Sequence, residues 1–364
     1  MNSSFQNVYK DKTVLITGHT GFKGSWLSLW LAELGAKIIG YSLEPPTEPN
    51  LFNSINLQER ITHIIGDVRD ESRLLSLFEE YQPEFVFHLA AQSLVRRSYK
   101  EPKLTYQTNV MGTVNILEAI RKTNSVKVCI IVTSDKCYEN RESVHCYKET
   151  DPLGGYDPYS SSKGCAELVT AAYRRSFFNP EYYNKTHNLA LSSVRAGNII
   201  GGGDWAGNRI IPDCVRALSK GEPIIVRNPE AIRPWHYVLE PLSGYLLLGA
   251  LMSKDGVKYS DAWNFGPEEE SETSVEELVK LTIKYWGRGN YVRDTATHPH
   301  EANLLKLDIS KTCKMLSWKP IYEISETVEK TVKWYKSFYS NVPAEKLQQF
   351  IVNEIADYVK QADK

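Results

Sequence analysis

The sequence lacks any run of about 18 apolar residues, which is roughly the length that a membrane-spanning helix requires. Residues 1–11 are polar and contain no apolar stretch followed by a cleavage site, so they do not resemble a secretory signal. From these two absences we expect a cytoplasmic protein that makes no contact with a membrane.

Cysteine pairs with disulfide or metal-site spacing are also missing. The six cysteines form no Cys-x-x-Cys motif, and a chain of 364 residues can bury a core without covalent staples. We therefore expect reduced thiols and no bound metal, with Cys137 as the one thiol near enough to the expected chemistry to take part in it.

A strong charge of either sign is absent as well. The formal net charge is −1, so the chain has no broad positive field and no basic stripe with which to attract nucleic acid. An anionic ligand must instead be held by individual Arg, Lys or backbone N–H groups.

What is present in the first half of the chain is a regular alternation. Strands are expected at Thr13–Thr17 and in the segments KIIGY, ITHIIGD, FVFHLA, VKVCIIVTS and LALSSVRAG. Helices are expected between them, including 104–121 and 159–176. Alternating strands and helices predict an α/β protein with a Rossmann-type, doubly wound parallel sheet.

The alternation ends after Arg195. Short strands in PIIVRN and AWNFG mix with helices expected near 211–219, 236–252, 274–286 and 322–340. We predict that residues 1–195, with a return segment near 235–265, form the sheet domain. Residues 196–234 and 266–364 are predicted to form a smaller mixed α/β domain over the ligand-binding edge of the sheet.

A glycine-rich turn, TGHTGFKG, lies between the first expected strand and helix. Gly18, Gly21 and Gly24 would let the backbone turn tightly and bring a pyrophosphate to the helix N-terminus, where free N–H groups favour negative charge. The motif predicts that the sheet domain binds a dinucleotide, and we expect NAD.

The choice between NAD and NADP depends on the end of the second strand. An NAD site usually has Asp or Glu there, whereas this strand ends with Ser42, and Glu44 is either a ribose ligand or a loop charge. His19 and Lys23 could instead favour a ribose phosphate. Asp67 is placed either to bind the adenine amino group or to start a helix.

Further cofactor contacts are expected along the same edge of the sheet. Asn109, inside the expected helix 104–121, either holds a water that orients Lys163 or is an ordinary interior asparagine. The remaining expected contacts are Phe22, Val68, Leu89, Ala90 and Ala91.

Tyr159 and Lys163 form a Tyr-x-x-x-Lys motif at the start of an expected helix. This spacing puts both side chains on one face, where an adjacent cation favours the phenolate and makes proton transfer from a hydroxyl feasible. Ser134, at the end of a strand, would share the substrate proton. The three residues predict oxidation or reduction at a hydroxyl-bearing carbon.

Together, TGHTGFKG, HLAAQ, NVMGTVNILEA, TSDKCY and YSSSK resemble the extended short-chain dehydrogenase/reductase family. More narrowly, GGGDWAGNRIIPD, RPWHYVLEPL, HEANLLKLDISK and the long segment that follows Gly21 are similar to those of the CDP-glucose 4,6-dehydratases. The resemblance implies NAD-dependent conversion of CDP-glucose to CDP-4-dehydro-6-deoxyglucose, in bacterial deoxysugar and O-antigen synthesis. It also implies a homodimer, or a dimer of dimers, formed through helices 104–121 and 159–176.

The elimination of water implied by this resemblance needs an acid and a base besides Tyr159. Asp135 and Lys136 are the candidates. In the related dTDP-glucose dehydratases this pair is Asp-Glu, so the base role does not transfer directly to Lys136. A lysine can act as a base only with a lowered pKa, and Lys136 could instead stabilise an enolate.

Substrate contacts are expected from polar residues around the cleft. Arg209 and Arg233 could bind phosphate, Asn198 the sugar phosphate, and Gln92 and Ser93 the sugar hydroxyls, although each could merely structure a loop. His88 is expected to be a packed histidine. Trp205 and Trp235 could stack on the base, but core positions are the commoner use of tryptophan.

Two rival functions use many of the same residues. A nucleotide-sugar epimerase or reductase would need Tyr159, Lys163 and Ser134 but would have no use for Asp135 and Lys136. A cofactor-sensing protein would have no need of an intact Tyr159 and Lys163.

Overall fold

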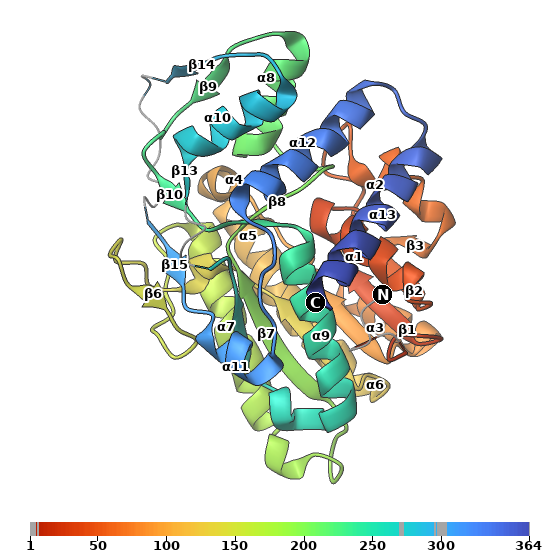
Figure 1. The fold of residues 1–364 in the computed structure, drawn as a ribbon. Coiled ribbons are helices and arrows are strands. Elements are labelled where there is room, and N and C mark those ends of the chain that lie inside the picture. The colour runs from red at the N-terminus through yellow and green to blue at the C-terminus, as the bar shows by residue number, and fades with distance from the viewer. Residues whose placement is uncertain (1–4, 6, 269–272, 295, 297–303, 364) are drawn as a thin grey trace.

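The computed structural model describes residue 5 and residues 7–268, 273–294, 296 and 304–363. Within these residues a parallel sheet has the strand order β12-β7-β5-β4-β1-β2-β3 (Figure 1). Its strands are β1 (Thr13–Thr17), β2 (Lys37–Ser42), β3 (Thr62–Ile65), β4 (Phe85–His88), β5 (Val128–Val132), β7 (Ala190–Ala196) and β12 (Ala262–Phe265). The order reverses between β1 and β4, which is the switch point where such sheets bind ligands. The predicted Rossmann-type fold is confirmed.

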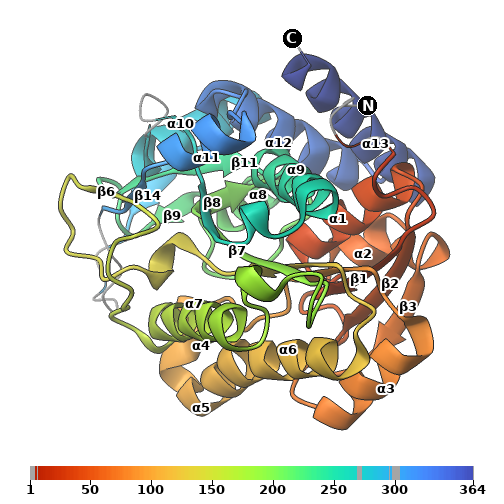
Figure 2. The same ribbon diagram turned by 90° about the horizontal axis from the view of Figure 1, so that it is seen from below.

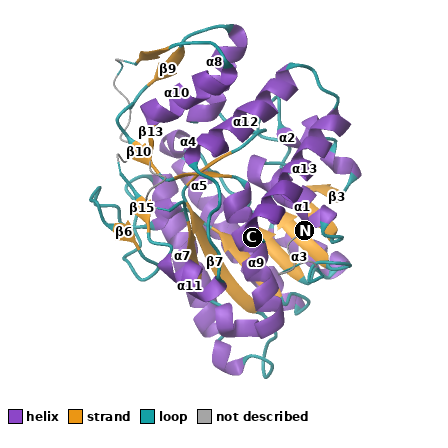
Figure 3. Cartoon of the chain, viewed as in Figure 1, coloured by secondary structure: helices purple, strands orange, loops and turns teal. Residues whose placement is uncertain are grey.

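Helices cover both faces of the sheet (Figures 2 and 3). One face carries α3 (Glu71–Tyr81), α6 (Gly112–Thr123) and α7 (Pro158–Ser176). The other carries α1 (Phe22–Glu33) and α9 (Leu239–Asp255). β5 is buried along its whole length, as is usual for a parallel strand covered on both faces.

The helix expected at 104–121 is interrupted. It consists of α5 (Pro102–Tyr106), a π-helical turn η2 (Gln107–Met111) and α6. Such turns are often found at functional sites. This one contains the buried Asn109.

The smaller lobe forms the upper part of the molecule in Figure 1. Its helices are α8 (Ile210–Lys220), α10 (Val275–Trp286) and α12 (Ile324–Tyr339), each within two residues of its predicted bounds. Its strand pairs are β8 (Asn198–Ile200) with β11 (Trp235–Tyr237), β9 (Ile224–Val226) with β14 (Tyr291–Arg293), and β10 (Ile232–Arg233) with β13 (Thr273–Ser274).

Short elements complete the described chain. They are α2 (Leu51–Ser54), α4 (Val95–Lys100), α11 (Ser310–Leu316), β6 (Cys146–Tyr147), β15 (Lys306–Leu307) and the 3-10 turns η1 (Leu57–Glu59), η3 (Asp135–Cys137), η4 (Pro180–Tyr182) and η5 (Gly256–Tyr259). Residues 300–303 of the HEANLLKLDISK motif lie outside the described residues.

The predicted domain boundary needs two corrections. The return to the sheet begins at α9, because β11 pairs with β8 in the smaller lobe. In addition, α13 (Ala344–Ala362), which the sequence analysis did not predict, packs on α1 of the sheet domain, where Tyr358 meets Trp30 edge to face. The reason lies in α1, which carries apolar side chains on all sides and so needs a cover on the face turned away from the sheet.

None of the helices in the described residues combines the length and apolar character needed to cross a membrane. The six cysteines are free thiols, and Cys137 is fully buried. Burial raises the pKa of the Cys137 thiol, so this structure does not support the reactive thiol considered from the sequence.

Candidate active site

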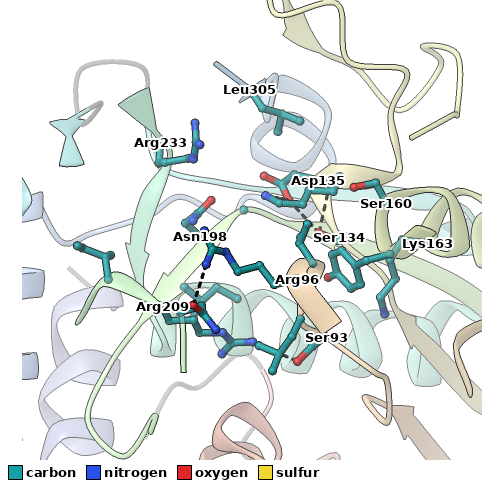
Figure 4. A pocket seen from close by; sticks show the side chains of 18 of the residues that line it. Ser93, Arg96, Ser134, Asp135, Ser160, Lys163, Asn198, Arg209, Arg233 and Leu305 are labelled. Atoms are coloured by element: carbon teal, nitrogen blue, oxygen red, sulfur yellow. Dashed lines mark hydrogen bonds and ion pairs between the residues drawn. The ribbon is translucent and has the colours of Figure 1, made fainter. Parts of the chain in front are cut away.

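A cavity of about 840 Å³ lies between the sheet domain and the smaller lobe, beyond the carboxyl ends of β4, β5 and β7 (Figure 4). Many of the residues predicted for the site line it. They are Phe22, Lys23, Leu89, Ala91, Ser93, Ser134, Asp135, Lys136, Tyr159, Lys163, Asn198, Arg209 and Arg233.

The glycine-rich loop is folded tightly against the end of β4. Gly18 has a φ of 77°, and a Cβ atom there would lie 2.8 Å from the backbone nitrogen of Ala90. A Cβ atom on Gly24 would lie 2.1 Å from the carbonyl oxygen of Gly18. Gly21 is the N-cap of α1, where no side chain caps the helix and no acidic residue occupies the first turn. This uncapped terminus fits a pyrophosphate group.

His19 does not offer a cation to a ribose phosphate. Its ring is fully buried, lies against Gly40 and is 2.6 Å from His63 between Nε2 and Nδ1. Burial and the neighbouring His63 lower the pKa of His19 to about 3, so the ring is neutral. Ser42 and Thr20 share a hydrogen bond of 2.9 Å. The expectation that the His19 side chain could favour NADP is therefore wrong.

Lys23 is the other residue that could have favoured a ribose phosphate. It lines the cavity at the catalytic end, where its charged neighbours are Lys163, Arg209 and Asp135. Burial and the two like charges lower the pKa of Lys23 to about 7. Its side chain belongs to the reaction cavity, not to the adenosine end of the site.

Asp67 pairs with Arg69 in the structure. A strong hydrogen bond with the Arg69 guanidinium holds the pKa of Asp67 below its ordinary value. The alternative, that Asp67 starts a helix, is wrong, because Asp70 is the N-cap of α3 and accepts the backbone N–H of Arg73. Val68, the next residue, is buried and packs beside Gly112. The adenine contact of Asp67 stays a prediction.

Gln92 and Asn109 bond to the protein itself. The Gln92 side-chain amide donates to Leu94 O and to Thr105 Oγ1, and its oxygen accepts Leu94 N–H, so it is not free to reach a sugar. Asn109 bonds to both backbone polar groups of Gln92 and donates to Ser162 Oγ at 2.8 Å. Asn109 therefore ties the loop after β4 to α7 beside Lys163, and no described contact joins it to Lys163 itself.

Tyr159 stands in the first turn of α7, whose N-cap Asp157 accepts the backbone N–H groups of Tyr159 and Ser160 at 3.0 Å. Burial raises the pKa of Tyr159 to about 12, although the interaction with the Ser134 side chain opposes the shift. Lys163 donates to Val132 O at 3.1 Å, and burial lowers its pKa to about 8. In the protein alone, burial is therefore the main influence on the pKa of Tyr159, and it disfavours the phenolate.

The Asp135–Lys136 pair occupies the short turn η3 after β5. Ser134 Oγ donates to Asp135 Oδ1 at 2.9 Å, and Lys136 Nζ lies 4.0 Å from the same oxygen. Asp135 Oδ2 is buried and has no hydrogen-bond partner among the described residues. The Lys136 side chain is 29% exposed. An acid and a cation therefore stand next to Ser134 and Tyr159 at the cavity wall.

On the substrate side, Arg209 lies between two elements of the cavity wall. Its guanidinium donates to Asp204 at 2.7 Å and to Ser93 at 3.2 Å, which links the smaller lobe to the loop after β4. Asn198 Oδ1 is buried without a partner among the described residues. Figure 4 shows Asn198 and Arg233 on the same side of the cavity.

The remaining sequence candidates are structural or peripheral. His88 is buried, bonds to Thr17 Oγ1 at 2.7 Å and is neutral, because burial lowers its pKa to about 3, so it is the packed histidine that was expected. Trp205 packs against Trp334, Tyr335 and Phe338 in the core. Trp235 lines the cavity and donates to Thr273 O at 3.1 Å.

A buried ion pair that was not expected from the sequence lies behind the catalytic turn. Glu167 accepts hydrogen bonds from Thr133 Oγ1, Ser193 Oγ and Arg195 Nη2, the last at 2.8 Å. Arg195 also donates to Tyr138 Oη at 2.7 Å. Burial would raise the pKa of Glu167, but Arg195 and the two hydroxyl groups outweigh it and keep the carboxylate ionised. The spacing of Glu167, four residues after Lys163, was the available signal.

We expect Arg195→Met to lower the free energy of unfolding by about 3–5 kcal/mol, because it leaves Glu167 buried without a counter-ion. The double variant Glu167→Leu with Arg195→Met should recover part of this loss. Urea unfolding followed by circular dichroism measures both. If Arg195→Met were as stable as the wild type, the Glu167–Arg195 pair would not stabilise the η3 turn.

Known proteins match nearly the whole chain in sequence. The sequence profile of the family described as GDP-mannose 4,6 dehydratase matches residues 15–331. The chain is 49% identical over 355 residues to the CDP-glucose 4,6-dehydratase of Salmonella typhimurium, covering 97% of this chain and 98% of that protein. It is 25% identical to the dTDP-glucose 4,6-dehydratase of Xanthomonas campestris, over 89% of this chain and 93% of that protein.

Solved structures share the fold. The dTDP-glucose 4,6-dehydratase of Bacillus anthracis in complex with NAD superposes with a TM-score of 0.72 at 22% identity, covering 90% of this chain and 97% of that chain. The UDP-glucose 4-epimerase of Thermotoga maritima with UDP-glucose gives a TM-score of 0.75 at 24% identity, covering 90% and 99%. On the evidence of the profile match and the 49% identity, the chain belongs to the GDP-mannose 4,6 dehydratase family.

Proposed function

We propose that this protein is an NAD-dependent hydro-lyase that converts CDP-glucose to CDP-4-dehydro-6-deoxyglucose. The observation that carries the proposal is the joining of Tyr159, Ser134 and Lys163 with the Asp135–Lys136 pair in one cavity. The 49% identity to a CDP-glucose 4,6-dehydratase over nearly the whole chain supports this choice of nucleotide sugar. A bacterial deoxysugar route such as O-antigen synthesis is consistent with the product.

The residues that would hold the dinucleotide fit NAD. The pyrophosphate would lie at the uncapped N-terminus of α1, and Ser42 would face the adenosine ribose. With His19 neutral and Lys23 in the reaction cavity, the two cations that kept NADP open are removed. Bound NAD would supply the acceptor for the carbon-4 hydride and the source of the hydride for carbon 6.

Oxidation at carbon 4 requires loss of the 4-hydroxyl proton. Tyr159 would take this proton, with Ser134 bonded to the same hydroxyl and Lys163 nearby as the cation. Because burial raises the pKa of Tyr159 to about 12, the phenolate needs additional positive charge from the complete site.

Elimination then removes the carbon-5 proton and the 6-hydroxyl. The new ketone at carbon 4 acidifies carbon 5, and Asp135 and Lys136 are the groups next to Tyr159 that can exchange protons with this part of the sugar. Asp135 would protonate the departing hydroxyl, and Lys136 would either accept the carbon-5 proton or stabilise the enolate. Both roles use residues that an epimerase would not need.

The first test is incubation of the purified protein with CDP-, dTDP-, UDP- and GDP-hexoses. We expect a 4-keto-6-deoxy product from CDP-glucose, detected by its alkaline absorbance and by mass spectrometry as a loss of water. A product that contained only epimerised hexose would contradict the dehydratase assignment and favour the epimerase reading.

Lys136→Ala should separate the two chemical steps. We expect elimination to slow by roughly 100-fold or more, the size of a lost general acid–base group, while NADH still forms from the carbon-4 hydride. Stopped-flow absorbance at the NADH band with CDP-glucose measures both. If NADH formation falls as much as elimination, Lys136 is not specific to the second step.

We also propose a homodimer formed through the outer faces of α6 and α7. Met111, Leu168 and Phe177 are 49%, 60% and 49% exposed on or beside these helices, and large exposed apolar side chains are typical of interaction surfaces. A second copy of the chain is the expected occupant, as in the resembled family.

Leu168→Glu should convert the dimer to a monomer, because a carboxylate would be buried at the interface. Size-exclusion chromatography with light scattering gives the mass. Val292→Glu, at an exposed apolar residue of β14, is the control and should leave the mass unchanged. A wild-type protein that is monomeric at high concentration would overturn the interface.

A further inference from the structure

Lys23 extends from the first turn of α1 into the catalytic half of the cavity. Within the described part of the chain, it forms no hydrogen bond or ion pair. Its charged neighbours are Lys163, Arg209 and Asp135, all visible around the cavity in Figure 4. The elimination chemistry derived above makes no use of Lys23.

The charges around Lys23 are not balanced. Arg209 is paired with Asp204 at 2.7 Å, so the charges left at this point are two cations, Lys23 and Lys163, against the carboxylate of Asp135. A cation that is partly removed from water and lacks a partner is costly, which is why the pKa of Lys23 is lowered to about 7. An anionic ligand in the cavity would restore the balance.

His236, a further neighbour of Lys23, adds no negative charge. It lies on β11, is 2% exposed, and neither of its ring nitrogens has a hydrogen-bond partner among the described residues. Burial and the charge of Lys23 lower the pKa of His236 to about 3, so the ring is a neutral neighbour of the ammonium group. The charged neighbours of Lys23 are therefore Lys163, Asp135 and an Arg209 that is already paired with Asp204, and His236 adds a neutral ring.

The backbone next to Lys23 favours the same kind of ligand. No side chain caps α1 and its first turn contains no acidic residue, so the helix N-terminus offers free N–H groups. Phe22, its neighbour, packs against Gly201 of the smaller lobe, where a Cβ atom would lie 3.1 Å from the ring. The first turn of α1 thus stands between the glycine-rich loop and the smaller lobe.

We propose that Lys23 is a diphosphate-binding residue whose ammonium group, with the N-terminus of α1, holds a diphosphate between the glycine-rich loop and Arg209. The proposal rests on the proposed function, in which both NAD and the nucleotide sugar carry a diphosphate. Lysine suits this position because its ammonium is a compact point charge that can bind phosphate oxygens on the side of the glycine-rich loop or on the side of Arg209.

The test measures ligand binding, independently of turnover. Lys23→Met, Lys23→Arg and the control Lys37→Met, at an exposed position of β2, are titrated with NADH, CDP, inorganic pyrophosphate and cytidine. For Lys23→Met we expect a roughly 10- to 100-fold weaker affinity for at least one diphosphate ligand, the range of a lost charge-assisted hydrogen bond. Cytidine binding should not change, and Lys23→Arg should recover part of the loss.

The affinities for NADH and for CDP distinguish the two sources of the diphosphate. A loss confined to NADH assigns Lys23 to the cofactor, a loss confined to CDP assigns it to the nucleotide sugar, and a loss for both places it between them. Unchanged affinities in a variant with a wild-type circular dichroism spectrum and melting temperature would overturn the proposal. If the wild type binds these ligands but does not dehydrate CDP-glucose, the proposed function fails. The change in affinity of Lys23→Met still tests the role of Lys23 in that case.

The pH dependence gives a second readout. A diphosphate binds the charged form of Lys23, so wild-type affinity should be greatest below pH 7 and should fall as the pH rises above the lowered pKa. Lys163, Arg209, Asp135 and His236 face the same ammonium and are present in both proteins, so the difference between wild type and Lys23→Met isolates Lys23. Parallel pH profiles for the two proteins would contradict the proposal.

Discussion

The buried ion pair between Glu167 and Arg195 is the constraint on which the site depends. It joins α7 to β7, and the Thr133 hydroxyl adds the end of β5 to the same carboxylate. Because α7 carries Tyr159 and Lys163 while the β5 turn carries Ser134 and Asp135, this pair sets the distance between the two halves of the catalytic group. Its energetic value as an ion pair is modest compared with a hydrophobic pair, but losing one partner is costly, which ties the geometry of the site to the integrity of the core.

Burial decides the proton chemistry of the cavity more than charge pairing does. It raises the pKa of Tyr159 to about 12 and lowers those of Lys163 and Lys23 to about 8 and about 7. The cavity in the protein alone therefore disfavours charge on each of these groups. Anionic and cationic parts of bound ligands would reverse these shifts together, so that the site reaches its working protonation state only when it is filled.

Several site features followed from short-range pattern. The glycine spacing of TGHTGFKG, the Tyr159–Lys163 spacing and the alternation of strands and helices each depend on local geometry, and the structure shows the corresponding loop, helix face and parallel sheet. Side-chain direction was harder to predict. From the sequence, Lys23 could have favoured a ribose phosphate and Gln92 could have reached the sugar. In the structure Lys23 lines the catalytic end of the cavity and Gln92 bonds within its own loop. A motif predicts the path of the backbone but not the partners of a long side chain.

The sequence by itself determined the sheet domain, its nucleotide edge and the residue types available for the chemistry. These features follow from residue patterns that span only a few positions of the chain. Only the tertiary structure decided which of those residues share a cavity, which charges are unbalanced there, and that α13 returns from the end of the chain to cover α1. These outcomes depend on contacts between residues far apart in the chain, such as Thr133 with Glu167 and Trp30 with Tyr358. Burial and the resulting pKa shifts arise from such contacts, and no local pattern encodes them.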